Sequence, residues 1–168
     1  MLPTRLDDIS EIPAPIVDSV KTCVLNTFES ISGVKPEFVN EGNGEEPLNG
    51  IIGNIAVFNT DHTLSMMIAI PKETALALSE VFCGMELPFE SDDMGDLVGE
   101  ISNILAGDVA ASIENVGFVG QSSLPTATRG SDLTLFLPNK PPTARLKFSG
   151  TGGEFWVNLA LSESRRHS

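Results

Sequence analysis

The chain has 168 residues, of which 41% are hydrophobic and 20% are charged, a composition that suits one well-filled core and is short for two. Its formal net charge of −13 argues against nucleic acid and against an anionic membrane surface as partners, because both require clustered lysine and arginine. The acidity favours, more weakly, a protein partner with basic side chains around its docking surface.

We expect neither a secretory leader nor a membrane-spanning segment in this sequence. The N-terminal segment lacks a basic start followed by an apolar core, and no run approaches the ~18 apolar residues of a membrane-spanning helix. We therefore expect a cytoplasmic protein. The two cysteines, Cys23 and Cys83, have no metal-site spacing and no secretory context, so we expect both to be reduced residues of the core.

The first half of the chain predicts a helix, a short strand and a hairpin. Residues 1–13 contain prolines and acidic residues and are expected to form a loose lead-in. Apolar residues recur at helical spacing over residues 16–31, and residues 34–39 could form a short strand. Two β-like runs, residues 51–58 and 63–70, flank a polar four-residue turn, which is typical of a hairpin.

The second half predicts two helices and then several strands. Pro71 suits the first turn of a helix that runs to about Phe82. Residues 91–116 form the longest helical pattern, with Ser91 as a good N-cap. Further strands are expected at residues 118–121, 133–137, 144–148 and 155–161, with a hairpin turn at 150–153 and a polar tail at 162–168.

This order of elements fits a two-layer α+β domain over residues 14–161, with about three helices packed on a roughly six-stranded sheet. An internal repeat is one interpretation, because two helices carry polar residues at equal spacing, and each is followed at a similar distance by a proline. The two sets are Ser19, Cys23, Asn26 with Pro47, and Asp96, Glu100, Asn103 with Pro125. Helical spacing alone would produce such a match often, so duplication and coincidence both stay open.

The polar side of the long helix is the first indication of a functional site. At ~100° per residue, its apolar residues fall on one broad side. The opposite stripe, roughly 60° wide, consists of Asp96, Glu100, Asn103 and Gly107. Small residues such as Gly99 flank this stripe, whereas an ordinary solvated face usually carries long charged side chains. The helix backbone is therefore approachable by a partner.

The pattern Asp96-x3-Glu100-x2-Asn103, followed by Pro125, resembles the signature of the CheC/CheX/FliY family of chemotaxis phosphatases. The resemblance, judged by element order, extends over residues 14–161. Because Cys23 stands where the first helix would need a glutamate, the resemblance implies one site per chain, as in CheX-like proteins. It also implies a pseudo-duplicated CheC/CheX-like fold and a homodimer.

The resemblance implies that the substrate is a phosphorylated CheY-like receiver domain, with Mg²⁺ held in the receiver's own site and no cofactor or metal in this chain. A loose phosphoryl-transfer transition state needs a water placed in line and little covalent chemistry, so a carboxamide can suffice. Asn103 would orient that water, and Glu100 would dock to a lysine of the regulator. Asp96 would add a peripheral contact, and Pro125 would shape a neighbouring loop. Gly99 and Gly107 are further candidate partner-binding positions, and at Gly95 and Gly99 either helix packing or close approach of a partner could require the glycine.

Three other interpretations remain beside this one. The same acidic helix could serve a non-catalytic module that binds a receiver or a flagellar-switch component, or the chain could be a purely structural dimerisation domain. Exposed Glu and Asn on an amphipathic helix are also often only solvated. Other chemistries fare worse, because His62 is expected in a surface turn and His167 in the tail, away from any nucleophile or metal partner.

Overall fold

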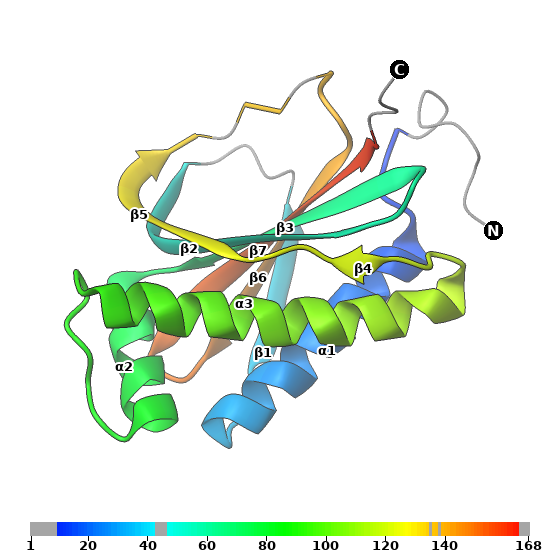
Figure 1. Ribbon diagram of the computed structural model, residues 1–168. Coiled ribbons are helices and arrows are strands. Elements are labelled where there is room, and N and C mark those ends of the chain that lie inside the picture. Colours follow the sequence, from blue (N-terminus) through cyan, green and yellow to red (C-terminus); the bar gives the residue numbers. More distant parts are fainter. Residues whose placement is uncertain (1–9, 43–46, 135, 138, 165–168) are drawn as a thin grey trace.

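The computed structural model describes residues 10–42, 47–134, 136–137 and 139–164. Within these residues, three α-helices cover one face of a seven-stranded antiparallel sheet, as Figure 1 shows. The predicted two-layer α+β domain is confirmed, with one strand more than expected. Most of the predicted lead-in, the last residues of the tail and His167 lie outside the described residues.

The helices begin and end where local signals place them. They are α1 (Ala14–Ser32), α2 (Lys72–Cys83) and α3 (Asp92–Ile113), the last followed by a 3₁₀ turn, η2 (Glu114–Val116). The hydroxyl of Ser91 accepts a hydrogen bond from the Met94 backbone N–H at 3.1 Å, and Asp92 and Asp93 add negative charge near the positive end of the helix dipole. The helix that was predicted to be the longest therefore starts at the expected N-cap.

The strands form one sheet in which every neighbouring pair is antiparallel. They are β1 (Glu37–Gly42), β2 (Leu48–Phe58), β3 (His62–Ile70), β4 (Gln121–Ser122), β5 (Thr126–Leu133), β6 (Thr143–Gly150) and β7 (Gly153–Glu163). Their order is β1-β6-β7-β3-β2, and β4 and β5 both pair with the outer side of β2. The predicted hairpins β2–β3 and β6–β7 are both present.

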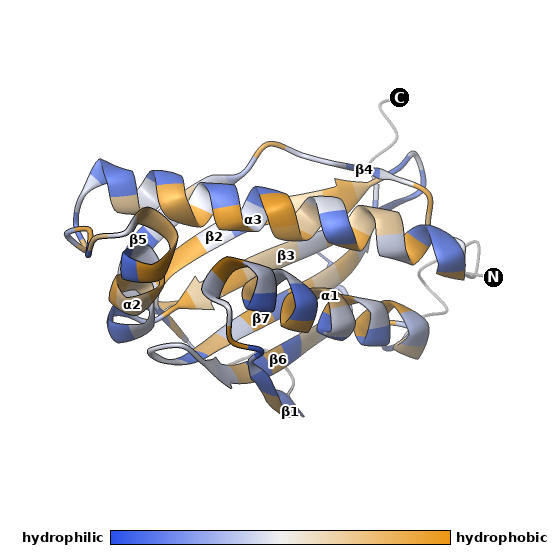
Figure 2. Cartoon of the chain, turned by 90° about the horizontal axis from the view of Figure 1, so that it is seen from below, coloured by the Kyte–Doolittle hydropathy of each residue, from blue (hydrophilic) through white to orange (hydrophobic). Residues whose placement is uncertain are grey.

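The topology has an internal two-fold symmetry. Exchanging α1, β1, β2 and β3 with α3, β5, β6 and β7 turns the sheet order β1-β6-β7-β3-β2-β5 into its own reverse. The central pair β3–β7 is exchanged with itself, and α1 and α3 lie side by side on the same face of the sheet (Figure 2). This arrangement is the one expected of a pseudo-duplicated fold.

The core lies between the inner face of the sheet and the apolar sides of α1 and α3, which Figure 2 shows facing the strands. Beneath α1, Phe28 stacks on Phe155 with ring centroids 4.2 Å apart, and Phe148 stacks on Phe155 at 5.3 Å. Beneath α3, a Cβ at Gly53 would overlap the hydroxyl of Ser102, so the helix approaches β2 very closely there. Stacked phenylalanine rings thus support α1, whereas a close contact between small residues supports α3.

Several expectations are corrected. The strand predicted at residues 133–137 lies earlier in the chain, as β5. The sequence pattern did not reveal it, because the polar and small residues of this edge strand do not alternate between an apolar and a polar face. His62 is buried beside the ring of Phe118 and does not sit at the surface, because it begins β3 instead of belonging to the turn. Cys83 is exposed at the end of α2, whereas Cys23 is buried as expected. Ile12, within the predicted lead-in, packs into the core.

Candidate functional site

A groove of about 800 Å³ runs between the outer side of α3 and the edge of the sheet. We call it the α3 groove. Its helix wall and its strand wall come from segments that are separated in the sequence but adjacent in the fold, as the parallel course of α3 and the β4–β5 segment in Figure 1 shows. Its lining includes Ser91, Asp92, Gly95, Asp96, Gly99, Glu100 and Asn103 on the helix side, and Leu124, Pro125, Thr126, Ala127 and Arg129 on the strand side.

The structure brings five of the six predicted site residues together in this groove. Asp96, Glu100 and Asn103 are exposed and follow one another at intervals of one helical turn, which places them on one side of α3. Gly99 and Pro125 line the same groove. Gly107 is exposed one turn beyond Asn103 and is not part of the lining. A carboxylate and a carboxamide therefore open side by side into one concave surface.

Small residues keep the groove open. A Cβ placed at Gly99 would lie 3.9 Å from Cγ of Pro125, so the helix and the proline ring face each other across the space of one missing side chain. A Cβ at Gly95 would meet nothing within 4 Å. Neither glycine is therefore required by tight internal packing, and a long side chain at Gly99 would fill the gap between the two walls.

The strand wall arises from a break in the edge strand. Both β4 and β5 pair with β2, through Val57 opposite Ser122 and Asn54 opposite Thr126, so they are two parts of one edge strand. Pro125 stands in the gap between them and has no N–H to donate to a ladder. The gap is nevertheless fixed, because the Ala56 N–H donates to the Ser123 hydroxyl at 3.0 Å and the Ser123 N–H donates to the Ala56 carbonyl at 2.8 Å.

The charge of the groove is mainly negative. Asp92, Asp96 and Glu100 line it, and Arg129 is the cation among the lining residues. Nη1 of Arg129 donates to the Phe89 carbonyl at 3.2 Å, and the guanidinium carbon lies 6.0 Å from the centre of the Phe89 ring. Arg129 therefore ties β5 to the segment that leads into α3. The rest of the groove offers carboxylates to a cationic group of a partner.

Most of the strand wall was not predicted from the sequence. Leu124, Thr126, Ala127 and Arg129 had no part in the predicted site, because the segment after Pro125 was not recognised as a strand. A signal was present, since Thr126-Ala127-Thr128 contains two β-branched residues directly after a proline. The absence of an apolar alternation concealed it.

The first helix does not repeat the site. Cys23, which takes the place of Glu100 in the proposed repeat, is only 8% exposed, whereas Glu100 is exposed. Burial raises the pKa of the Cys23 thiol, a hydrogen bond with Ser112 acts in the opposite direction, and the charge of Asp108 raises it further. Ser112 and Asp108 both belong to α3, so the Cys23 side chain faces the contact between α1 and α3. Asn26 is exposed, but no carboxylate accompanies it at the position of Cys23.

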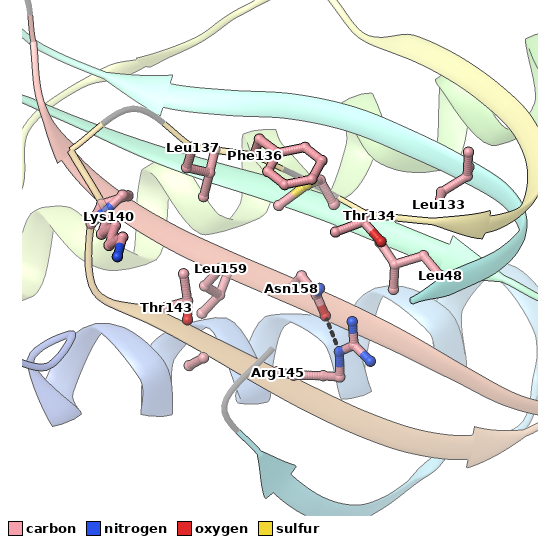
Figure 3. Close-up of a pocket in the computed structure, with 13 residues that line it drawn as sticks. Leu48, Leu133, Thr134, Phe136, Leu137, Lys140, Thr143, Arg145, Asn158 and Leu159 are labelled. Carbon is pink, nitrogen blue, oxygen red and sulfur yellow. Dashed lines mark hydrogen bonds between the residues drawn. The ribbon is translucent and has the colours of Figure 1, made fainter. Parts of the chain in front are cut away.

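A second hollow of about 470 Å³ lies on the opposite face of the sheet, and Figure 3 shows its floor and rim. Nε of Arg145 donates to Oδ1 of Asn158 at 2.9 Å, and apolar residues such as Leu48, Met67 and Leu133 line the same hollow. None of the predicted site residues lines it. Across the described part of the chain, no group of three His, Cys, Asp or Glu side chains is arranged to hold a metal ion, and no helix has the length and apolar character needed to cross a membrane.

The chain is similar to chemotaxis proteins of known structure. The CheX protein of Vibrio vulnificus is 18% identical, with a TM-score of 0.80 over 89% of this chain and 100% of that chain. A CheC-like superfamily protein of a Shewanella species is 15% identical, with a TM-score of 0.81 over 90% and 99%. The match to the CheX–CheY–BeF3–Mg²⁺ complex of Borrelia burgdorferi is 21% identical, with a TM-score of 0.68 over 89% and 96%.

A comparison with curated proteins finds no match. The decisive comparison is with family models, in which residues 49–149 match chemotaxis phosphatase CheX. This range contains both walls of the α3 groove, from Ser91 to Arg129. The chain therefore belongs to the CheX family of chemotaxis phosphatases.

Proposed function

We propose that this protein accelerates hydrolysis of the aspartyl phosphate of a CheY-like response regulator, and that the phosphorylated site of the regulator docks into the α3 groove. The observation that carries the proposal is the exposure of Glu100 and Asn103 on one side of α3, beside the open space between Gly99 and Pro125. Membership of the CheX family supports the general role.

Asn103 is the residue assigned to the chemistry. Its carboxamide can accept a hydrogen bond from a water molecule and donate one to the phosphoryl region at the same time. The water oxygen attacks phosphorus while the bond from phosphorus to the aspartyl oxygen breaks. The products are a free aspartate on the regulator and inorganic phosphate, which takes up the proton of the water. Because the transition state is loose, positioning the water supplies most of the help that is needed.

Glu100 is assigned to docking. It lies one turn before Asn103, in a groove whose carboxylates suit a cationic partner group, and a lysine beside the regulator's phosphate would be that group. Asp96, one turn earlier, adds a peripheral contact. Gly99 leaves the helix backbone approachable, and Gly107, beyond the groove, would let the partner surface continue along the helix.

The remaining apparatus belongs to the partner. Mg²⁺ would be held by the receiver domain, and this chain would bring no cofactor of its own. We also propose a homodimer in the cytoplasm, in which each chain contributes one α3 groove. Pro125 then acts as a fixed wall that limits how the receiver can approach Asn103.

The two exposed asparagines of the symmetry-related helices give a matched test. Asn103→Ala should reduce the acceleration of phosphate release by roughly 10²-fold, the usual effect of losing one positioned donor or acceptor at a reaction centre. Asn26→Ala, on α1, should leave the rate unchanged. The measurement is the decay of a phosphorylated CheY receiver with Mg²⁺, with the circular dichroism of each variant as the control for folding.

Two results would contradict the mechanism. Full activity of the double variant Glu100→Ala/Asn103→Ala would remove the α3 groove from the chemistry. Binding of the receiver that depends on phosphorylation, without faster phosphate release by the wild-type protein, would instead assign the chain as a non-catalytic receiver-binding or flagellar-switch module.

A further inference from the structure

One highly exposed side chain of the α3 groove is apolar. Leu124 is 89% exposed, although a polar side chain would be fully hydrated at the same surface position. The other large aliphatic side chain in the lining, Ile51, is fully buried beneath the groove. Leu124 is therefore the one bulky apolar group that this rim presents to a partner within the described lining.

The position of Leu124 is fixed by its neighbours. Two hydrogen bonds tie Ser123 to Ala56 of β2, and the Ser123 hydroxyl also lies 3.2 Å from the Leu124 carbonyl. On the other side, the ring of Pro125 restricts the backbone and faces Gly99. The side chain thus projects from a backbone that is already ordered, so little conformational freedom of the backbone remains to be lost when a partner covers it.

The chemical setting of Leu124 is that of a docking residue. It shares the groove with Glu100 and Asn103, and the residues that follow it, Thr126 and Ala127, are small. An apolar side chain beside carboxylates fits a partner surface that carries a basic group next to an apolar patch. Interfaces concentrate binding energy in a few centrally buried side chains, with polar contacts around them.

We propose that Leu124 is the apolar anchor that inserts into a hydrophobic patch beside the phosphorylation site of the receiver domain. This inference rests on the proposed function and assigns receiver binding and the chemical step to different residues of the α3 groove. Leu124 sets the affinity for the receiver, while Asn103 acts on the chemical step. Leu124 makes no contact with the reacting atoms, so its removal should raise KM and leave kcat at the wild-type value.

The experiment is steady-state dephosphorylation of a CheY receiver, phosphorylated with acetyl phosphate in the presence of Mg²⁺. Leu124→Ala should raise KM by roughly 10-fold, the loss expected when a leucine can no longer be buried at an interface. Leu124→Met, which keeps an apolar side chain of similar volume, should restore KM to within a few fold of wild type. Leu124→Asn should behave as Leu124→Ala does.

Two exposed apolar residues outside the groove serve as matched controls. Val119 is 66% exposed just before β4, and Phe136 is 90% exposed in the connection between β5 and β6, near the hollow on the other sheet face. Val119→Ala and Phe136→Ala should leave KM unchanged. A rise in KM for Phe136→Ala, with none for Leu124→Ala, would place docking on the opposite face and overturn the proposal.

Direct binding separates this inference from the proposed function. In the Asn103→Ala background, which suppresses turnover, the dissociation constant for phosphorylated receiver should rise by roughly the same 10-fold factor on adding Leu124→Ala. If the wild-type protein dephosphorylates the receiver but Leu124→Ala has wild-type KM, the anchor is wrong and the function stands. If the wild-type protein neither binds nor dephosphorylates the receiver, both the anchor role of Leu124 and the proposed function are wrong. A Leu124→Ala variant with lower kcat and unchanged KM would also overturn the anchor role.

Discussion

The two halves of the molecule share one topology and differ at the edge of the sheet. In the first half, the space between α1 and the edge strand β1 is bridged by long side chains, with Nζ of Lys21 lying 4.0 Å from the centre of the Phe38 ring. In the second half, the corresponding space between α3 and β5 is left open between Gly99 and Pro125. The α3 groove therefore results from a few local residues and not from the fold itself.

The edge strands differ in the same way. β1 runs continuously from Glu37 to Gly42 with one bulge, whereas its counterpart is interrupted at Leu124 and Pro125 and becomes β4 and β5. The interruption opens the groove in which the outward carboxylate and carboxamide of α3 are accessible. In α1 the position of the carboxylate is taken by a buried cysteine, so α1 does not present the pair of side chains that α3 presents.

The largest expected effect concerns the support of α1. Phe155→Ala should lower the free energy of unfolding by about 3–5 kcal/mol, because it removes the central ring of the Phe28, Phe155 and Phe148 stack and leaves a cavity. Urea denaturation measures this loss. Phe136→Ala, at an exposed phenylalanine, should change stability by less than about 0.5 kcal/mol. Below the transition, the folded Phe155→Ala variant should keep the proposed phosphatase activity, since the ring stack lies beneath α1 and the α3 groove lies between α3 and the β4–β5 edge.

A smaller effect is expected where α3 approaches β2. Gly53→Ala would push its methyl group into the Ser102 hydroxyl, which already donates to the Val98 carbonyl at 2.7 Å, and would bring it to 3.2 Å from Cβ of Ser102 and Cγ1 of Val98. The hydroxyl must therefore turn away, and the neighbouring atoms of α3 must give way by a few tenths of an ångström. We expect a loss of about 1–3 kcal/mol in unfolding free energy and, unlike for Phe155→Ala, a fall in kcat, because Asn103 moves with the helix.

A second substitution tests this explanation. Adding Ser102→Ala to Gly53→Ala removes the overlapping hydroxyl and should recover part of both losses, as measured by denaturation and by phosphate release. Equal kcat for wild type and Gly53→Ala would show that the position of α3 on β2 does not set the geometry of the α3 groove.

The sequence predicted the helix wall of the site and not the strand wall, for a physical reason. The capped start at Ser91 and the outward row of Asp96, Glu100 and Asn103 follow from helical periodicity, which is a local property of the chain. The strand wall depends on pairing with β2, and β5 exposes nearly every residue, so no periodic pattern marks it. Pro125 was predicted to shape a neighbouring loop, but its position opposite Gly99 is a tertiary contact.

The same limit applies to other residues. Spacing places Cys23 and Glu100 at equivalent positions of their helices, but the direction in which a helical residue faces depends on how the helix packs, and Cys23 faces α3. His62 was predicted in a turn because a sequence pattern defines the ends of a strand only approximately, and β3 begins at this residue. The overall α+β order, in contrast, followed from the alternation of long helical and short β-like runs.

The smallest expected effect concerns the contact between the two halves. Cys23 lies one turn from Thr27, whose hydroxyl donates to the Asp108 carboxylate of α3 at 2.6 Å. Burial raises the pKa of the Cys23 thiol, a hydrogen bond with Ser112 lowers it, and the Asp108 charge raises it; the net direction is upward. The folded chain therefore holds the thiol proton more tightly than the unfolded chain does. The stability that this proton contributes is complete below the pKa of an unfolded cysteine and is lost as the pH rises through it toward the folded value.

The free energy of unfolding should accordingly fall more steeply above about pH 9 in the wild-type protein than in Cys23→Ala. Cys83→Ser, at the exposed thiol of α2, should follow the wild-type curve. The slopes are compared, and not the absolute values, because Cys23→Ala also leaves a small cavity. Parallel curves for wild type and Cys23→Ala would show that the thiol is solvated, and that the contact between α1 and α3 does not exclude water at Cys23.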